Sequence, residues 1–231
     1  PCGRYVTVFT RLLCDESAER LDALAALIAA EIDALAKLHL GGTPRCVLVA
    51  GLGNREITAD SIRPKTVDRL TVTRHIREHD EALFNSYFRV PLCAIAPGVL
   101  GQTGIETAEL VGGVAKTARP DLILAVDALA ARATERLGAT VQISDSGIFP
   151  GSGIGNRRSE ISMRTLGVPV IAIGVPTVVN SATLVYDALQ SAGYTEVDDR
   201  MERVLHEGES FFVSPRQSDR ISESVADMLA D

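Results

Sequence analysis

Cysteine and histidine are scarce in this chain of 231 residues, which has four of each. No Cys-X-X-Cys pair occurs, and no histidine lies at metal-ligand spacing from a cysteine. This pattern excludes a zinc site of the paired-cysteine type and favours a reducing compartment over a disulfide framework. Cys46 and Cys93 lie in apolar runs, so we predict that they are small core residues.

Positive charge is also scarce, because 23 lysines and arginines stand against 30 aspartates and glutamates and leave a net charge of −7. No basic cluster is interleaved with aromatic residues, as direct nucleic-acid binding would require. The apolar runs fall well short of the roughly 20 residues that span a membrane, and no signal peptide is visible. We therefore expect a cytoplasmic protein with no direct nucleic-acid or membrane partner.

The sequence does contain a repeated pattern, in which a short apolar run is followed by a turn and a helical segment. The apolar runs lack strict alternation, which is typical of strands covered on both faces of a parallel sheet. The helical segments repeat apolar residues at three- and four-residue spacing. The predicted strands are residues 45–54, 91–99, 121–129, 140–147 and 169–179, with an added strand at 4–13; the predicted helices are 17–38, 104–118, 128–138, 182–192 and 220–231.

Strands that alternate with helices indicate an α/β fold. The chain is 46% hydrophobic and 23% charged, an ordinary globular composition, and no linker or repeat divides it. We therefore expect a single domain over residues 1–231, a mostly parallel sheet flanked by helices with 17–38 packed on one face. In such sheets binding sites form beyond the carboxyl ends of the strands, so polar residues at those ends are the first candidates for function.

Several common catalytic and binding motifs are incomplete. "GLGN" (51–54) lacks the third glycine of a dinucleotide-binding fingerprint, and "GSGIGNRR" (151–158) lacks the GK[ST] end of a P-loop. No GxSxG sequence marks a hydrolase serine, and "HIREH" (75–79) lacks the glutamate position of HExxH. We predict that the glycine-rich segment 147–157 is a mobile loop that borders the cleft and shapes the substrate site, not a nucleotide cradle.

Two carboxylates remain as candidates for chemistry. Asp60 lies at a predicted helix start, and Asp127 lies where a predicted strand passes into a predicted helix, so each is explained structurally as a helix cap. Brought together in the crevice, the two would instead share a proton, because like charges at short range do not both ionise readily. Such a pair activates water with one member and protonates a leaving amine with the other. The residues alone leave both interpretations open.

Longer blocks resemble one known family. "TADSIRP" (58–64), "AIAPGVLGQTGIETAELV" (94–111), "DLILAVDALAARATERLGATVQISDSGIFPGSGIGNRRSEIS" (121–162) and "TLGVPVIAIGVPTVV" (165–179) closely resemble the germination proteases of endospore-forming bacteria. The resemblance covers about residues 47–180. It implies an endopeptidase that degrades small acid-soluble spore proteins during germination in the cytoplasm of the spore core. It also implies a fold similar to the hydrogenase-maturation proteases, a zymogen activated by loss of an N-terminal segment, and a homotetramer.

The family is regarded as an atypical aspartic protease with two essential aspartates, which the matching blocks place at Asp60 and Asp127, and with no cofactor or metal. Ala59 and Arg63 stand where the family usually has proline and glycine, so the loop that holds Asp60 is expected to differ in rigidity and charge. Further residues are predicted to line the cleft in support of the two aspartates: Asn54, His75, Glu106, Asp145 and Ser146.

Two other classes of function stay open. The first is a metal-binding or non-catalytic relative, in which the carboxylates and His75 supply oxygen and nitrogen ligands. The second is a structural spore protein that shares the fold without its chemistry. The presence of both aspartates favours the protease.

Overall fold

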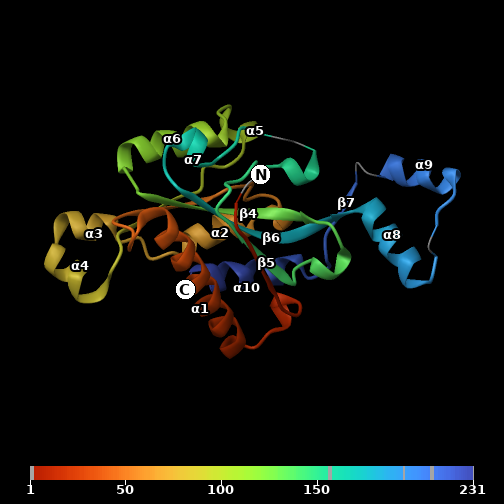
Figure 1. Ribbon diagram of the computed structural model, residues 1–231, viewed down its shortest axis with the longest axis horizontal. Helices are drawn as coiled ribbons and strands as arrows, with labels where there is room; N and C mark the ends of the chain where they lie inside the picture. The colour runs from red at the N-terminus through yellow and green to blue at the C-terminus, as the bar shows by residue number, and fades with distance from the viewer. Residues whose placement is uncertain (1–2, 156–157, 195, 209–210, 231) are drawn as a thin grey trace.

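Four of the predicted strands lie side by side and parallel, from the middle to one edge of a seven-stranded sheet, in the computed structural model (Figure 1). They are β2 (Val47–Gly51), β3 (Leu92–Ile95), β4 (Leu122–Ala131) and β6 (Val170–Asn180). The structure describes residues 3–155, 158–194, 196–208 and 211–230. Within these residues the strand order is β1-β5-β6-β4-β2-β3, with β7 paired to β6. Every residue of β2 is buried, which explains why its sequence is continuously apolar.

The remaining strands of the described chain are antiparallel. β5 (Thr140–Ser144) runs antiparallel to β6, β1 (Tyr5–Phe9) pairs with β5, and β7 (Phe212–Val213) pairs with the end of β6. The α/β class and the parallel centre are therefore confirmed, as is the added strand near the N-terminus. The fifth apolar run differs in its direction. Because β5 is reversed, the chain after Ser144 leaves the sheet at the edge where the parallel strands begin.

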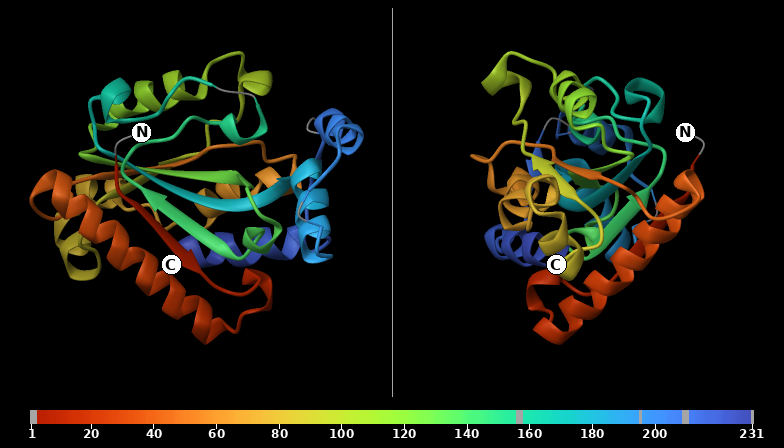
Figure 2. Two further views of the ribbon diagram at one scale, coloured as in Figure 1. Left: turned by 45° about the vertical axis from the view of Figure 1, so that its right-hand side comes forward. Right: turned by 90° about the vertical axis from the view of Figure 1, so that its left-hand side faces the viewer.

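Helices cover both faces of the sheet (Figures 1 and 2). One face packs against α1, α2 and α10 and shares a core with Ile28, Ile62 and Val225. The opposite face packs against α6 and α7, with Val111 and Ala115 in its core, and α5 lies on the same side. The bounds of these helices are α1 Ala18–Leu40, α2 Ile62–Arg69, α5 Leu100–Thr103, α6 Thr107–Ala118, α7 Met163–Leu166 and α10 Ser218–Ala230.

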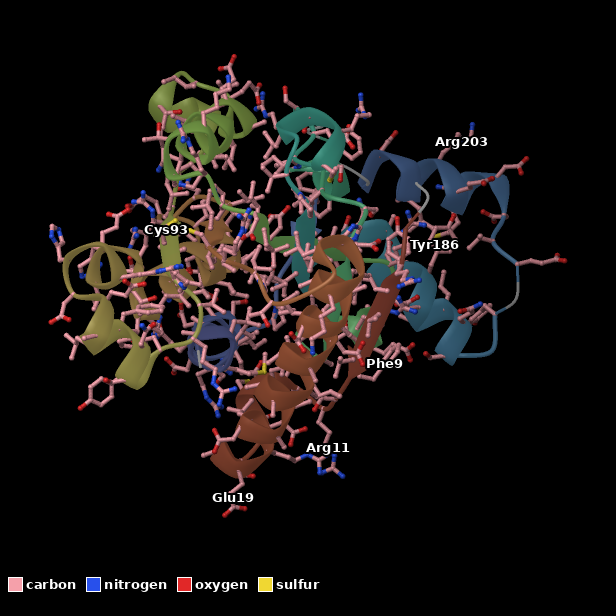
Figure 3. All side chains as sticks on the ribbon, turned by 60° about the vertical axis from the view of Figure 1, so that its left-hand side comes forward. Phe9, Arg11, Glu19, Cys93, Tyr186 and Arg203 are labelled. Atoms are coloured by element: carbon pink, nitrogen blue, oxygen red, sulfur yellow. The ribbon has the colours of Figure 1, made fainter. Side chains whose placement is uncertain are left out.

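The other helices lie at the two ends of the sheet. α3 (Arg74–His79) and α4 (Glu81–Tyr87) are packed together beside β3, whereas α8 (Ser181–Ser191) and α9 (Asp199–Gly208) project at the opposite end. Figure 3 shows Tyr186 on α8 and Arg203 on α9 at this projecting end. Short 3-10 turns complete the chain: η1 Leu13–Asp15, η2 Thr58–Asp60, η3 Thr134–Arg136 and η4 Ser152–Ile154.

The helix predicted for residues 128–138 is wrong. β4 continues through this region to Ala131 and pairs with β6, with one register irregularity after Leu129, before the chain turns into η3. Alanine and leucine favour helices intrinsically, but that preference is a few tenths of a kcal/mol per residue. A full ladder of backbone hydrogen bonds to β6 and burial beside it outweigh that preference.

No helix in the described part of the chain is long and apolar enough to cross a membrane.

Candidate active site

The site lies where the sheet changes its direction of winding. After β2 the chain crosses to β3 on one side, and it later returns to β4 on the other side of β2. In open α/β sheets the crevice at such a switch point, beyond the carboxyl ends of the strands, is the usual binding site. β2 ends at Gly51, which pairs with Val126, so Asp127 is the first residue of β4 beyond the end of its neighbour.

Asp127 is a buried residue within a strand, and it is not a helix cap. It pairs with Gly174 of β6, and its side chain is 4% exposed. The capping interpretation of Asp127 is therefore wrong, because no helix follows it. A buried carboxylate needs a partner, and for Asp127 the partner is a positive charge.

Asp60 approaches the same place from the last position of η2. One of its oxygens, Oδ2, accepts a hydrogen bond from the backbone N–H of Asn54 at 2.6 Å. α2 begins after Ser61, which makes no side-chain capping bond, so Asp60 closes the loop 54–60 and does not cap the helix. Its side chain is 31% exposed, which leaves Asp60 as the solvent-facing carboxylate of the two.

Arg63 joins the two carboxylates. Its Nη1 donates to Oδ1 of Asp127, its Nη2 donates to Oδ1 of Asp60, and both contacts are short ion pairs. The guanidinium is itself buried, and its Nε has no hydrogen-bond partner in the described part of the chain. The structure therefore brings Asp60 and Asp127 to one cation that lies between them.

Two glycines at the end of β2 make this arrangement possible. A Cβ on Gly51 would lie 2.4 Å from the carbonyl oxygen of Arg63, and a Cβ on Gly53 would lie 2.6 Å from its Cζ. The absence of side chains at both positions lets α2 approach the strand and lets the Arg63 side chain cross its end. The two glycines of the "GLG" sequence thus make room for an arginine side chain and not for a dinucleotide.

The electrostatics of the site follow from burial. Burial raises the pKa of the Asp127 carboxyl to about 6, while Arg63 and the backbone N–H of Ala128 act in the opposite direction. Burial also lowers the pKa of the Arg63 guanidinium, an effect that Asp127 opposes. An arginine side chain keeps its charge at neutral pH. The site at pH 7 therefore contains an ionised Asp127 paired with a charged Arg63.

Arg63 was not predicted as a site residue from the sequence, although a signal was present. It lies three residues after Asp60, a spacing that places two side chains on one face of a helical segment. A buried arginine also needs a carboxylate, and Asp127 was already a candidate.

Of the residues predicted to line the cleft, Asn54 is the one that the structure brings to the carboxylates. Its backbone N–H binds Asp60, and its side-chain Oδ1 accepts from Gln102 Nε2 at 2.8 Å. Glu106 lies at the start of α6, where Arg158 Nη1 is 3.9 Å from its Oε1. It thus faces the glycine-rich segment, and no contact joins it to Asp60 or Asp127 in the described structure.

His75 lies at the wrong edge of the sheet. It is an exposed residue of α3, and α3 is tied to the amino ends of the strands through the bond from Arg77 to the carbonyl oxygen of Arg45. The prediction that His75 lines the cleft is therefore incorrect. In the described residues no group of three or more His, Cys, Asp or Glu side chains comes together as a metal site, His75 included.

The prediction that Asp145 and Ser146 line the cleft is also wrong, because β5 is antiparallel. Asp145 accepts from the backbone N–H of Arg4 at 2.7 Å and lies 3.1 Å from His39 Nε2. Ser146 accepts from the Tyr5 hydroxyl at 2.9 Å. Burial raises the pKa of Asp145, but the Arg4 amide and His39 outweigh it and hold that pKa below its usual range. These two residues anchor the N-terminal strand.

The glycine-rich segment returns to the carboxyl edge of the sheet. A Cβ on Gly153 would lie 3.1 Å from the Cβ of Ala130, three residues after Asp127. Residues 156 and 157 of this segment lie outside the described residues. Beside it an open hollow of about 720 Å³ lies between α6 and α7. The hollow is lined by residues of the loop and both helices, among them Phe149, Arg158 and Leu166, and not by the two aspartates.

The thiols do not add a nucleophile to this site. Cys46 and Cys93 are half-buried, so the prediction that they are core residues is only partly confirmed. Burial raises the pKa of Cys93 to about 11, which keeps this thiol protonated at neutral pH.

Comparison with known proteins decides the family. The sequence profile of the germination proteases matches residues 1–193. The chain belongs to the germination protease family. It is 48% identical over 188 residues to the germination protease of Priestia megaterium (strain ATCC 12872 / QMB1551), covering 81% of this chain and 50% of that protein.

Two further members of the germination protease family show how far the match extends. The enzyme of Bacillus subtilis (strain 168) is 44% identical over 208 residues, covering 88% of this chain and 56% of that protein. The enzyme of Clostridium perfringens (strain 13 / Type A) is 38% identical over 258 residues, covering 100% of this chain and 77% of that protein. The chain thus spans about half the length of the first two relatives.

Among solved structures, the chain is similar to a [NiFe] hydrogenase maturation protease, HycI, from Thermococcus kodakarensis KOD1. The TM-score is 0.37 with 15% sequence identity, over 86% of this chain and 99% of that one. A similarity this weak carries no conclusion about the site.

Proposed function

We propose that this chain is an endopeptidase that degrades small acid-soluble spore proteins during germination, using Asp60 and Asp127 to activate water. The observation that carries the proposal is the convergence of the two carboxylates at the switch point of the sheet. Membership of the germination protease family supports the reaction class. In this proposal residues 1–231 act as one catalytic domain, without cofactor or metal, in the cytoplasm of the spore core.

The surroundings of the two aspartates suggest different roles. Asp127 is buried with a raised pKa, which suits the acid that protonates the leaving amine. Asp60 is the more exposed carboxylate, held by the Asn54 N–H, which suits the base that activates water. Attack of that water on the scissile carbonyl would give a tetrahedral intermediate, whose collapse releases the amine.

The test is cleavage of a small acid-soluble spore protein by the chain, with chelator present throughout. Asp127→Asn keeps the size of the side chain but removes the ionisable group, so we expect a loss of roughly a thousand-fold or more. Asp121→Asn is the matched control, because Asp121 immediately precedes the same strand and binds Arg45 at the opposite edge. Full activity of a folded Asp127→Asn variant, or a requirement for added metal, would refute the proposal.

Two properties of the whole protein complete the proposal. We propose a homotetramer, with apolar surface buried between protomers, and a zymogen that is activated by removal of an N-terminal segment. Sedimentation at micromolar concentration should then show a species several times the 24.6 kDa of one chain. A single species of the protomer mass would contradict the assembly without touching the catalytic proposal.

A further inference from the structure

We propose that Arg63 restrains the carboxylate pair by occupying the place between Asp60 and Asp127 that a catalytic water and a shared proton require. The inference rests on the proposed function and concerns the control of the same site.

The partners of Arg63 point to this role. Its two ion pairs are both with site carboxylates, through Nη1 to Asp127 and through Nη2 to Asp60. Its Nε is buried and has no hydrogen-bond partner among the described residues. The guanidinium is therefore held in the interior by the two aspartates, and releasing either one removes a large part of what fixes it there.

The charge balance explains the effect on chemistry. Two carboxylates that share one proton carry one negative charge, and two ionised carboxylates beside one guanidinium carry the same charge. Arg63 thus takes the electrostatic place of the shared proton. A guanidinium does not give up its proton in the neutral range, so it neutralises the pair without supplying the acid that a leaving amine needs.

Access to Asp127 leads to the same conclusion. The side chains of Asp127 and Arg63 are 4% and 6% exposed, and that of Asp60 is 31% exposed. A substrate that reaches Asp60 therefore finds both Arg63 and Asp127 covered. Nη1 and Nη2 each donate to a site carboxylate and Nε is covered, so the guanidinium is directed at the two aspartates.

Removing the cation should release the pair. With Arg63→Ala, burial of Asp127 is no longer opposed by a positive charge, so this carboxyl should hold its proton at pH 7 beside an ionised Asp60. The space left by the side chain admits water. Arg63→Lys is the matched control, because it keeps one positive charge in the same place but loses the fork that reaches both carboxylates.

The experiment compares wild type, Arg63→Ala, Arg63→Lys and Arg63→Ala/Asp127→Asn at pH 7, with a small acid-soluble spore protein as substrate. Each folded protein is also treated with 1,2-epoxy-3-(4-nitrophenoxy)propane, which an accessible aspartate dyad attacks to form an ester that mass spectrometry locates. We expect Arg63→Ala to cleave at least ten-fold faster than wild type, Arg63→Lys to gain less than Arg63→Ala because it keeps the positive charge, and the double variant to be inactive. We expect the epoxide to label Asp60 in Arg63→Ala, where the ionised Asp60 attacks and the protonated Asp127 donates to the epoxide oxygen, and to label neither aspartate in wild type, where no carboxyl of the pair holds a proton.

Other results have definite meanings. A folded Arg63→Ala variant that cleaves no faster than wild type overturns the inference and leaves the proposed protease intact. If neither protein cleaves, the proposed function fails, and labelling of Asp60 in Arg63→Ala alone would still support the restraint by Arg63. Equal labelling of both proteins, or of neither, overturns it. If Arg63→Ala does not fold, Arg63→Gln is measured in its place, because it keeps most of the side-chain volume without the charge. The same results then support or overturn the inference.

Discussion

The backbone of Gly53 lies directly against the guanidinium of Arg63, close enough that a Cβ at residue 53 would lie 2.6 Å from Cζ and 2.9 Å from Nε and Nη1. This contact fixes the path by which Arg63 crosses the end of β2 and reaches Asp127. Gly53, just after β2, and Arg63, in α2, therefore together determine where the guanidinium lies between Asp60 and Asp127.

The first prediction concerns that contact. Gly53→Ala should destabilise the fold by about 1–3 kcal/mol, because the new methyl group overpacks a buried charged side chain at a backbone φ of +152°, which residues with a side chain rarely adopt. Gly42→Ala is the control, since a Cβ there meets nothing within 4 Å. Urea unfolding of the two variants measures the difference. Equal stability of Gly53→Ala and Gly42→Ala would show that Arg63 moves aside freely.

The second prediction concerns stability and pH. The pKa of Asp127 is raised to about 6 by burial, so the folded protein binds this proton more tightly than the unfolded chain does. The stabilising contribution is complete below about pH 4 and is lost as pH rises through about 6. Each pKa unit corresponds to about 1.4 kcal/mol, so the loss is on the order of 3 kcal/mol.

Asp127→Asn does not titrate, so it isolates this contribution. The unfolding free energy of wild type minus that of Asp127→Asn should decline between pH 4 and pH 6 in urea titrations. A difference that stays constant, or grows, over that window contradicts the raised pKa of Asp127.

The third prediction concerns activity and pH. The charged partner that faces Asp127 is Arg63 of α2, which also joins it to Asp60 of η2, while the neighbouring strands present uncharged residues at Gly51 and Gly174. Protonation of Asp127 breaks one of the two ion pairs of Arg63. The cleavage rate of wild type should therefore rise as pH falls through about 6.

Arg63→Ala supplies the comparison for this profile. Without the guanidinium, Asp127 holds its proton at higher pH, so the variant should already be fast at pH 7 and gain little on acidification. Superimposable pH profiles for wild type and Arg63→Ala would be inconsistent with a restraint by Arg63.

The centre of the fold is predictable from sequence because burial on both faces leaves continuous apolar runs, as in β2 and β4. The direction of β5 is not, because its sequence has the same apolar character as its parallel neighbours. That single reversal moves Asp145 and Ser146 from the carboxyl edge to the amino edge of the sheet. An apolar run shows that a strand is buried but not which way it points.

The site was predictable in part. Asp127 follows from its strand end, and both Asp60 and Asp127 follow from the family resemblance. The helix expected after Asp127 is absent because pairing with β6 overrides the helical preference of "ALAA". Arg63 lies at the centre of the site because the absence of side chains at Gly51 and Gly53 leaves room for it. Such a contact joins residues from two elements, so it produces no periodic pattern in the sequence of either element.

The most direct test of the central claim, that Asp60 and Asp127 act as one catalytic unit, is a double-mutant cycle. Initial cleavage rates are measured for wild type, Asp60→Asn, Asp127→Asn and the double variant at about pH 5.5 with chelator, each checked for folding by circular dichroism. We predict that each single variant loses roughly a thousand-fold and that the double variant is little slower than either one, because residues that act as a unit are non-additive. Losses that multiply in the double variant, or a folded single variant with wild-type activity, would contradict the claim.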